Sequence, residues 1–228
     1  MKTDFENGYI LCIDKPYAWT SADVVAKVKN LLKFEAGYKK IKVGHAGTLD
    51  PLATGLLIIC TGKATKQAET IQSGEKEYIA DICFGATTPS YDSETEIDER
   101  YPYEHITEET IKRAFNSFLG TIEQVPPVFS AKLIDGKRAY EYARKGEYPE
   151  MRPASVTVSE LELLEFKPPH AKIRIRCGKG TYIRSFARDL GLALAGGAYL
   201  SGLRRTRSGD YSVDNALSIR EVEYLIGL

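Results

Sequence analysis

The sequence is poor in the residues that build metal sites and disulfide frameworks. Its 228 residues include only four cysteines and three histidines, and no Cys-x-x-Cys pair occurs. Zinc ligands and disulfide networks need clustered spacing, so neither a metal ion nor a disulfide framework is expected. Each cysteine follows or ends an apolar run, which is typical of a buried free thiol in a reducing compartment. These residues are Cys12, Cys60, Cys83 and Cys177, and His45, His105 and His170.

The sequence also lacks a long apolar segment and a nucleotide-binding glycine motif. Its longest stretch without a charged residue is Leu190–Leu203, 14 residues, whereas a membrane-spanning helix needs about 20. The first six residues contain no apolar run that would suit a secretory signal. Neither G-x-x-x-x-G-K-[ST] nor G-x-G-x-x-G is present. The sequence therefore predicts a soluble cytoplasmic protein with no membrane partner and no nucleotide cofactor.

The whole chain has no excess of basic or acidic residues, but individual segments do. The chain has 31 basic and 31 acidic residues. Residues 92–109 contain eight acidic residues and one basic, whereas residues 132–188 contain 13 basic and seven acidic. A protein binds nucleic acid through a local basic patch, so a net charge of zero does not exclude a nucleic-acid partner. Solvated surface faces would account for the same pattern.

The hydrophobic patterns predict an α+β domain around a mixed or antiparallel sheet. Alternating or continuous apolar runs indicate the strands, and N-cap residues and apolar stripes indicate the helices. Because no linker interrupts them, we expect one domain of residues 1–228. Strands are expected at 9–13, 41–44, 55–60, 76–84, 156–166 and 171–177, and helices after Thr20, at 107–118, 138–145, 181–195 and 217–226.

The densest group of unusual residues is Gly44–Gly55, with the sequence GHAGTLDPLATG. Pro51 restricts Asp50 to an extended backbone, on a loop between two expected strands. That arrangement would suit a fixed nucleophile or base. Asp-Pro is also a common way to begin a turn, and for the motif taken alone a structural role is the favoured interpretation.

A second candidate is Lys179–Arg184, which follows an expected strand and begins a helix. Such a turn can hold a phosphate at the helix N-terminus, and an arginine beside Asp50 would favour the charged carboxylate. An ordinary glycine turn with a surface arginine is the alternative. Tyr78, in Lys76-Glu77-Tyr78, is a weaker candidate because tyrosines on strands usually serve packing.

Several motifs in one order resemble the TruB family of tRNA pseudouridine synthases. The resemblance runs from about Gly8 to about Tyr211, nearly the whole chain. The motifs are Asp14-Lys-Pro16 with Thr20-Ser21, Gly44–Gly55, Lys76–Tyr78, Gln124–Pro127, Phe129–Lys132, Gly136–Arg138, Ala143–Gly146, Gly180–Arg184 and Leu203–Arg205.

The resemblance implies a largely antiparallel central sheet flanked by helices, and isomerisation of uridine 55 in the T arm of tRNA to pseudouridine without cofactor or metal. Asp50 would be the catalytic aspartate, Tyr78 would stack on the target base, and Arg184 would pair with Asp50. His45 would fill the stack that the flipped base leaves. Three further residues would support substrate binding, Tyr182 and Leu203 as pocket walls and Lys15 beneath the active-site loop.

The resemblance also implies an RNA-gripping insertion around residues 129–152. Binding of the T stem-loop there would depend on phosphate contacts and therefore on salt. Many relatives carry a further C-terminal RNA-binding domain, for which this chain shows no segment of that size, and we expect a monomer. The RNA-binding candidates are Lys132, Lys137, Arg138, Arg144 and Lys145, with Arg204 and Arg205.

Other interpretations stay open. A tRNA-folding chaperone would need the RNA grip without the chemistry of Asp50. A glycoside hydrolase would need a second carboxylate, for which Asp92 and Glu77 are candidates. Within the synthase interpretation, the carboxylate could attack C1′ or abstract a ribose proton. The chain departs from the family at Ala18, where most relatives have glycine, and at Pro89.

Overall fold

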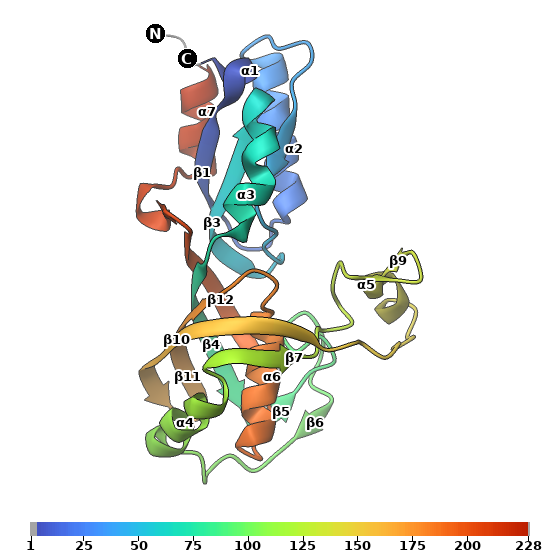
Figure 1. Ribbon diagram of the computed structural model, residues 1–228, viewed down its shortest axis with the longest axis vertical. Helices are drawn as coiled ribbons and strands as arrows, with labels where there is room; N and C mark the ends of the chain where they lie inside the picture. Colours follow the sequence, from blue (N-terminus) through green and yellow to red (C-terminus); the bar gives the residue numbers. More distant parts are fainter. Residues whose placement is uncertain (1–3, 228) are drawn as a thin grey trace. The chain divides into compact units, whose positions relative to one another are not determined.

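The computed structural model describes residues 4–227 and divides into two compact units. Unit 1 comprises the chain up to Tyr78 and from Leu203 onward, and unit 2 is Ile79–Gly202. The chain passes between the units within two strands, β4 (Lys76–Phe84) and β12 (Ala198–Ser208) (Figure 1). Whether the two units fold as the one domain expected from the sequence stays a prediction.

The centre of unit 1 is β3 (Ala53–Thr61), buried along nearly its whole length. It pairs antiparallel with β1 and β2, and parallel with β12 over Leu203–Arg205. Apolar residues on both faces explain this position, because such runs suit a strand that is covered on both sides. The other elements of unit 1 are α1 (Phe5–Gly8), β1 (Ile10–Lys15), α2 (Ser21–Phe34), β2 (Val43–His45), η1 (Gly62–Gln67), α3 (Ala68–Ser73), β13 (Tyr211–Ser212), η3 (Val213–Asn215) and α7 (Ile219–Gly227).

The helix α2 begins where the sequence predicts. The Thr20 side chain accepts a hydrogen bond from the Asp23 backbone, and the Asp23 side chain accepts one from the Thr20 backbone. This capping box satisfies two of the amides that a helix N-terminus leaves unpaired. Residues four apart, Val24, Val28 and Leu32, then form its buried stripe.

Unit 2 is built on antiparallel strands, in which β10 pairs with both β11 and β7. The helix α6 (Ile183–Ala193) has seven buried residues, and one of them, Phe186, packs edge-to-face on Phe118 with ring centroids 5.2 Å apart. The other elements of unit 2 are β5 (Ala86–Thr87), β6 (Glu99–Arg100), α4 (Glu108–Ala114), η2 (Phe115–Ser117), β7 (Gly120–Gln124), β8 (Leu133–Ile134), β9 (Lys137–Arg138), α5 (Ala139–Ala143), β10 (Ala154–Lys167) and β11 (His170–Cys177).

The predicted fold class is confirmed. Among the described residues, nine strands share one mixed, largely antiparallel sheet in the order β1–β3–β12–β4–β11–β10–β7, with β2 beside β3 and β13 beside β12. Among the strands of this sheet, the sequence patterns missed β7, β12 and β13. Within residues 4–227, no helix is long and apolar enough to cross a membrane.

Candidate active site

Asp50 lies on the loop between β2 and β3, and Arg205 of β12 holds the first part of this loop. The guanidinium donates from Nη2 to the Gly47 carbonyl at 3.1 Å, from Nη1 to the Thr48 carbonyl at 3.3 Å and from Nε to the Leu56 carbonyl at 2.8 Å. Arg205 is 1% exposed. A buried, planar fork of donors therefore fixes three carbonyls at once.

Ser21 holds the residue before Asp50. Its hydroxyl accepts a hydrogen bond from the Leu49 amide at 2.8 Å and donates one to the Leu49 carbonyl at 2.9 Å. Both residues are buried. Since Ser21 opens α2, this reciprocal pair attaches the loop to the start of a capped helix. The sequence offered Ser21 as part of an N-cap and gave no sign of its contact with Leu49.

Lys15 holds the residue after Asp50. Its ammonium donates to the carbonyls of Pro16 at 3.0 Å, Trp19 at 2.5 Å and Pro51 at 3.2 Å, and the side chain is 0% exposed. Burial lowers the pKa of Lys15 to about 8, against the opposing effect of the Asp50 charge. The structure thus places Lys15 beneath the loop, where the resemblance predicts it.

Ala18, where the chain departs from the family, lies in a turn between Pro16 and Trp19, whose carbonyls both accept hydrogen bonds from Lys15. Ala18 has a φ of +63°, in the left-handed region where a side chain costs about 1–2 kcal/mol and glycine costs nothing. A glycine, which the resemblance leads us to expect at this position, would avoid that cost. Here the three hydrogen bonds of Lys15 maintain the turn despite that cost.

His45 is half-buried on β2, opposite Ile59 of β3. Burial, and secondarily the Arg205 charge, lowers its pKa, so its ring is neutral at pH 7. Within residues 4–227 its buried Nδ1 has no hydrogen-bond partner. An aromatic ring can stack against a base, and this role of His45 stays a prediction from the resemblance.

Two further predicted residues come from β12, which is next to β3, and from β4, which is next to β12. Leu203 of β12 lies opposite Ala53, and its carbonyl accepts a hydrogen bond from Thr54 Oγ1 at 3.4 Å. Tyr78 on β4 is 8% exposed. Its neighbour Glu77 accepts a hydrogen bond from Thr206 Oγ1 at 2.8 Å, which connects β4 to β12.

The structure separates the roles of Arg204 and Arg205. Arg205 was predicted to bind RNA, but its guanidinium is buried and bonded to the carbonyls of Gly47 and Thr48 in the loop and of Leu56 in β3, so in this structure it offers no charge to a phosphate. Arg204 is partly exposed and makes two hydrogen bonds to Asp14, at 3.0 and 2.7 Å.

In unit 2, Arg184 is 5% exposed in the first turn of α6. Its Nε lies 3.6 Å from Asp92 Oδ2, and its Nη1 donates to the Ser90 carbonyl at 3.4 Å. Asp92 Oδ1 also accepts from Ser90 Oγ at 2.6 Å. Asp92 is thus a buried partner of Arg184. Asp50 belongs to the other unit, so its pairing with Arg184 stays a prediction.

Tyr182 lies immediately before α6 and is held by Gln124. Gln124 Nε2 donates to the Tyr182 carbonyl at 3.1 Å, and its Oε1 accepts from the Tyr182 amide at 2.8 Å. Gln124 is buried at the end of β7. The turn expected within Lys179–Arg184 is present at Lys179–Gly180, and the amide pair of Gln124 and Tyr182 connects its C-terminal side to β7.

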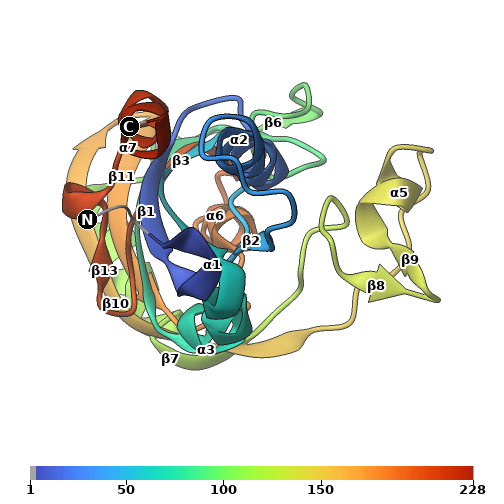
Figure 2. The same ribbon diagram turned by 90° about the horizontal axis from the view of Figure 1, so that it is seen from above.

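The predicted insertion contains a two-stranded hairpin, β8–β9, followed by α5, and the three elements are grouped together in Figure 2. Two of its cations lie over aromatic rings, Arg144 over Tyr140 at 5.2 Å and Lys137 over Tyr142 at 5.9 Å. Its basic side chains are mostly exposed, which leaves their charge available to a polyanion. These are Lys132, which is half-buried, and Lys137, Arg138, Arg144 and Lys145, which are exposed.

The arrangement in unit 1 can hold one carboxylate rigidly. Side chains from β1, α2 and β12 fix residues 47, 48, 49 and 51, on both sides of Asp50. Within residues 4–227, no three His, Cys, Asp or Glu side chains are grouped as they would be around a metal ion. The geometry favours chemistry by a positioned carboxylate, such as nucleophilic attack or proton abstraction.

Comparison with known proteins supports this interpretation. Residues 29–183 match the family described as TruB family pseudouridylate synthase (N terminal domain). Curated proteins named tRNA pseudouridine synthase B are 56% identical in Phocaeicola vulgatus, over 95% of this chain and 92% of the relative, and 51% identical in Flavobacterium johnsoniae, over 95% of both.

Solved structures agree. A chain in the crystal structure of a Cbf5-Nop10-Gar1 complex superposes with a TM-score of 0.73 at 30% identity, over 96% of this chain. A chain in a structure of an H/ACA RNP bound to a substrate RNA containing 2′-deoxyuridine gives 0.70 at 28%, also over 96%. This chain spans 55% and 54% of the length of those two chains. With the family model covering most of its length, the chain belongs to the TruB family of pseudouridylate synthases.

Proposed function

We propose that this enzyme converts uridine 55 in the T arm of tRNA to pseudouridine, with Asp50 as the catalytic carboxylate. The observation that carries the proposal is the loop of Asp50, which Arg205, Ser21 and Lys15 fix on both sides. The tRNA substrate is supported by the relatives named tRNA pseudouridine synthase B. The position in tRNA and the role of Asp50 follow from the resemblance of the loop motif.

The reaction is an isomerisation and needs no added atom or electron. The bond between N1 and C1′ breaks, the uracil turns, C5 bonds to C1′, and the C5 proton leaves while N1 gains one. A carboxylate can attack C1′ to give a covalent ester-like intermediate, or remove a ribose proton to give a glycal. Both routes need the carboxylate within reach of the ribose, and the fixed loop supplies that placement.

The uridine must leave the folded T loop before Asp50 can reach it, at a cost of a few kcal/mol. We expect His45 to occupy the vacated stack, because its ring is neutral and half-buried. Tyr78 would hold the detached uracil by stacking, worth about 1–3 kcal/mol per base. Leu203 and Tyr182 would wall the pocket and exclude water, which would otherwise leave an abasic site. tRNA as substrate also agrees with the predicted cytoplasmic location.

The test uses a tRNA transcript labelled with tritium at C5 of uridine, incubated with the purified protein and EDTA. Pseudouridine formation releases the tritium to water, and digestion then yields pseudouridine with no free uracil. Release of free uracil would indicate a hydrolase. Tight tRNA binding without tritium release would indicate the chaperone. Either result would overturn the proposal.

Activity is expected to fall as the pH rises through about 8, because Lys15 then loses its proton. Its ammonium has three N–H donors for three carbonyls, whereas the neutral amine has two. An unfolded lysine holds its proton to about pH 10.4, so Lys15 deprotonation by itself raises the free energy of unfolding over this range. Activity should therefore decline while the fold, followed by circular dichroism, persists.

The control for this pH profile is Lys15→Gln, which cannot titrate. We expect it to be less active than the wild type at pH 7 and to lack the decline near pH 8. A wild-type profile that stays flat between pH 7 and pH 9.5, or the same decline in Lys15→Gln, would contradict the role of Lys15.

A further inference from the structure

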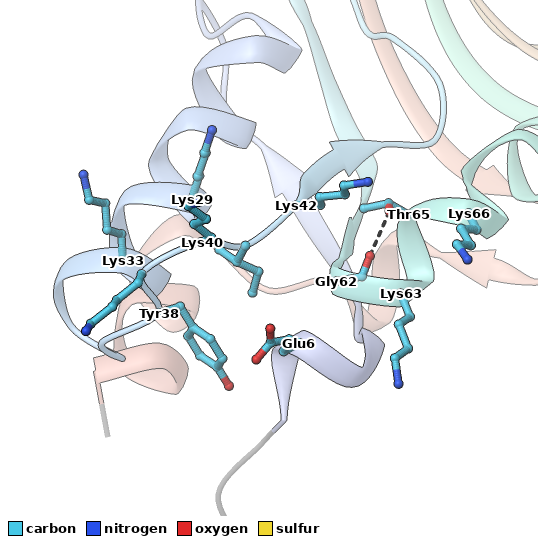
Figure 3. Close-up of a pocket in the computed structure, with 12 residues that line it drawn as sticks. Glu6, Lys29, Lys33, Tyr38, Lys40, Lys42, Gly62, Lys63, Thr65 and Lys66 are labelled. Atoms are coloured by element: carbon cyan, nitrogen blue, oxygen red, sulfur yellow. Dashed lines mark hydrogen bonds between the residues drawn. The ribbon is translucent and has the colours of Figure 1, made fainter.

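A lysine-rich pocket in unit 1 lies outside the site described above. It has a volume of about 650 Å³ and is formed by the C-terminal half of α2, the segment before β2, η1 and α1. Figure 3 shows its lysines arranged around Tyr38 and Glu6. We call it the lysine pocket, and its cationic residues are Lys29, Lys33, Lys39, Lys40, Lys42, Lys63 and Lys66.

The positive charge of the lysine pocket is not neutralised by the protein. Glu6 is the only acidic residue among its described lining residues. All seven lysines are exposed, and within residues 4–227 none lies in an ion pair with a carboxylate. Lys63 donates a hydrogen bond to the Asn7 side chain at 2.7 Å. In a chain of zero net charge, such a concentration of one sign creates a local field that attracts polyanions.

The contrast with Lys27 shows that the pattern is local. Lys27 is on the same helix as Lys29 and Lys33, and its Nζ lies 2.5 Å from Glu223 Oε1 of α7. The side of α2 that faces α7 therefore has its cation paired within the protein. On the side that faces the lysine pocket, Lys29 and Lys33 make no ion pair with a carboxylate of the described residues, and Lys33 lies over the Phe34 ring at 4.9 Å.

The composition of the lysine pocket favours a polymeric phosphate over a small anion. Among the described lining residues there is no arginine for bidentate recognition and no buried cation. An exposed ammonium group on a flexible side chain acts as a point charge. Several such groups can bind several phosphates without a precise geometry. Nucleic-acid backbones are bound in this way, by several lysines that each neutralise one phosphate.

The lysine pocket is well separated from the candidate catalytic loop. Ala53, whose amide donates to the Asp50 carbonyl, begins β3, and Gly62 at the lysine pocket follows its end. At about 3.4 Å per residue, the two ends lie up to roughly 30 Å apart. That length equals about nine phosphate spacings along one strand of a duplex, so a nucleic acid that contacts both places extends over several phosphates.

We propose that the lysine pocket binds the phosphate backbone of tRNA outside the T arm. The inference rests on the proposed function, because a T arm held at Asp50 leaves the rest of the tRNA to reach this distance. The lysine pocket contributes affinity for whole tRNA without contributing to the choice of the target uridine. An inorganic phosphate or a free nucleotide is the other source of the same chemistry.

The test compares whole tRNA with an isolated T-arm hairpin. The variant Lys39→Gln/Lys40→Gln/Lys63→Gln removes three exposed charges, and the matched control Lys112→Gln/Arg113→Gln/Lys167→Gln removes three from unit 2. We expect the first to weaken whole-tRNA binding on the order of tenfold and to lower the slope of log affinity against log salt by about 2–3. T-arm binding, and all binding by the control, should stay unchanged.

Three results would overturn the proposal. Unchanged whole-tRNA affinity in the first variant would show that the lysine pocket does not touch tRNA. Equal weakening for whole tRNA and the T-arm hairpin would place the target arm itself there. Saturable binding of ATP or inorganic phosphate that the variant abolishes, with tRNA binding intact, would identify a small-anion site.

The readouts are independent of the proposed function. If the enzyme does not make pseudouridine, the tritium assay fails on both RNAs for every variant, while the binding comparison still reports on the lysine pocket. Because the three lysines are exposed and make no ion pair with a carboxylate of the described residues, and the hydrogen bond of Lys63 to Asn7 is itself exposed, we expect the variant to melt close to the wild type. Each single substitution gives the same comparison with a smaller effect.

Discussion

Replacing Asp50 by asparagine is expected to reduce the rate of pseudouridine formation by at least about 10⁴-fold, a loss typical of removing a reacting group. The amide keeps the shape of the side chain but can neither attack C1′ nor accept a ribose proton. The backbone around it should be unchanged, because Arg205, Ser21 and Lys15 fix carbonyls and an amide rather than the carboxylate. Tritium release under single-turnover conditions measures the effect.

Affinity for tRNA separates this loss from a binding defect. Asp50→Asn should bind tRNA within about threefold of the wild type, since removing a carboxylate from an RNA site does not weaken phosphate contacts. Asp210→Asn, a change at an exposed position, is the matched control and should retain the wild-type rate. If Asp50→Asn kept more than about a tenth of the rate, Asp50 would not be the reacting group.

Replacing Arg205 by lysine is expected to lower the rate about 100-fold while keeping the charge. A lysine ammonium cannot reach three carbonyls that a planar guanidinium spans. Each buried carbonyl left unpaired costs about 1–3 kcal/mol, and a loop displaced by about 1 Å is enough to lose two orders of magnitude in rate. We therefore expect lower kcat, lower unfolding free energy and nearly unchanged tRNA affinity.

Arg207→Lys is the control for that prediction. Arg207 lies on the same strand but is exposed, so the change should leave rate and stability close to wild type. If Arg205→Lys instead weakened tRNA binding and salt dependence with kcat preserved, Arg205 would act on RNA, as the sequence suggested. The balance between kcat and affinity thus decides between the two roles.

Elements with local signals were predictable from the sequence. The alternation of apolar residues placed β4 at Lys76–Phe84 with its observed bounds. The helix α2 was predicted to follow Thr20 because its cap and its buried stripe lie within one short segment. Both features depend on neighbouring residues, which a sequence displays directly.

The strand β12 was not predicted because its sequence contradicts its position. It carries three arginines and a glycine, a pattern that reads as an exposed basic segment. Arg205 is buried because carbonyls of residues 47, 48 and 56 accept its hydrogen bonds, and those acceptors are about 150 residues away in sequence. Only the folded chain shows that this charge is satisfied internally.

The sequence proposed the residues of the candidate site, but of the side chains that hold its loop it named only Lys15 in that role. The loop motif singled out Asp50, and the family resemblance added the other members. The contacts of Ser21 with Leu49 and of Gln124 with Tyr182 join distant segments, so no motif announces them. The lysine pocket was missed for a related reason, because its charges come from two separate stretches of the chain.

The most direct test of the account is to map pseudouridine in one unmodified tRNA transcript treated with the wild type or with Asp50→Asn. After carbodiimide treatment, primer extension stops at each pseudouridine. The account predicts a single new stop that reports position 55 with the wild type, and none with Asp50→Asn. A stop at another position, or the same stop with Asp50→Asn, would contradict it.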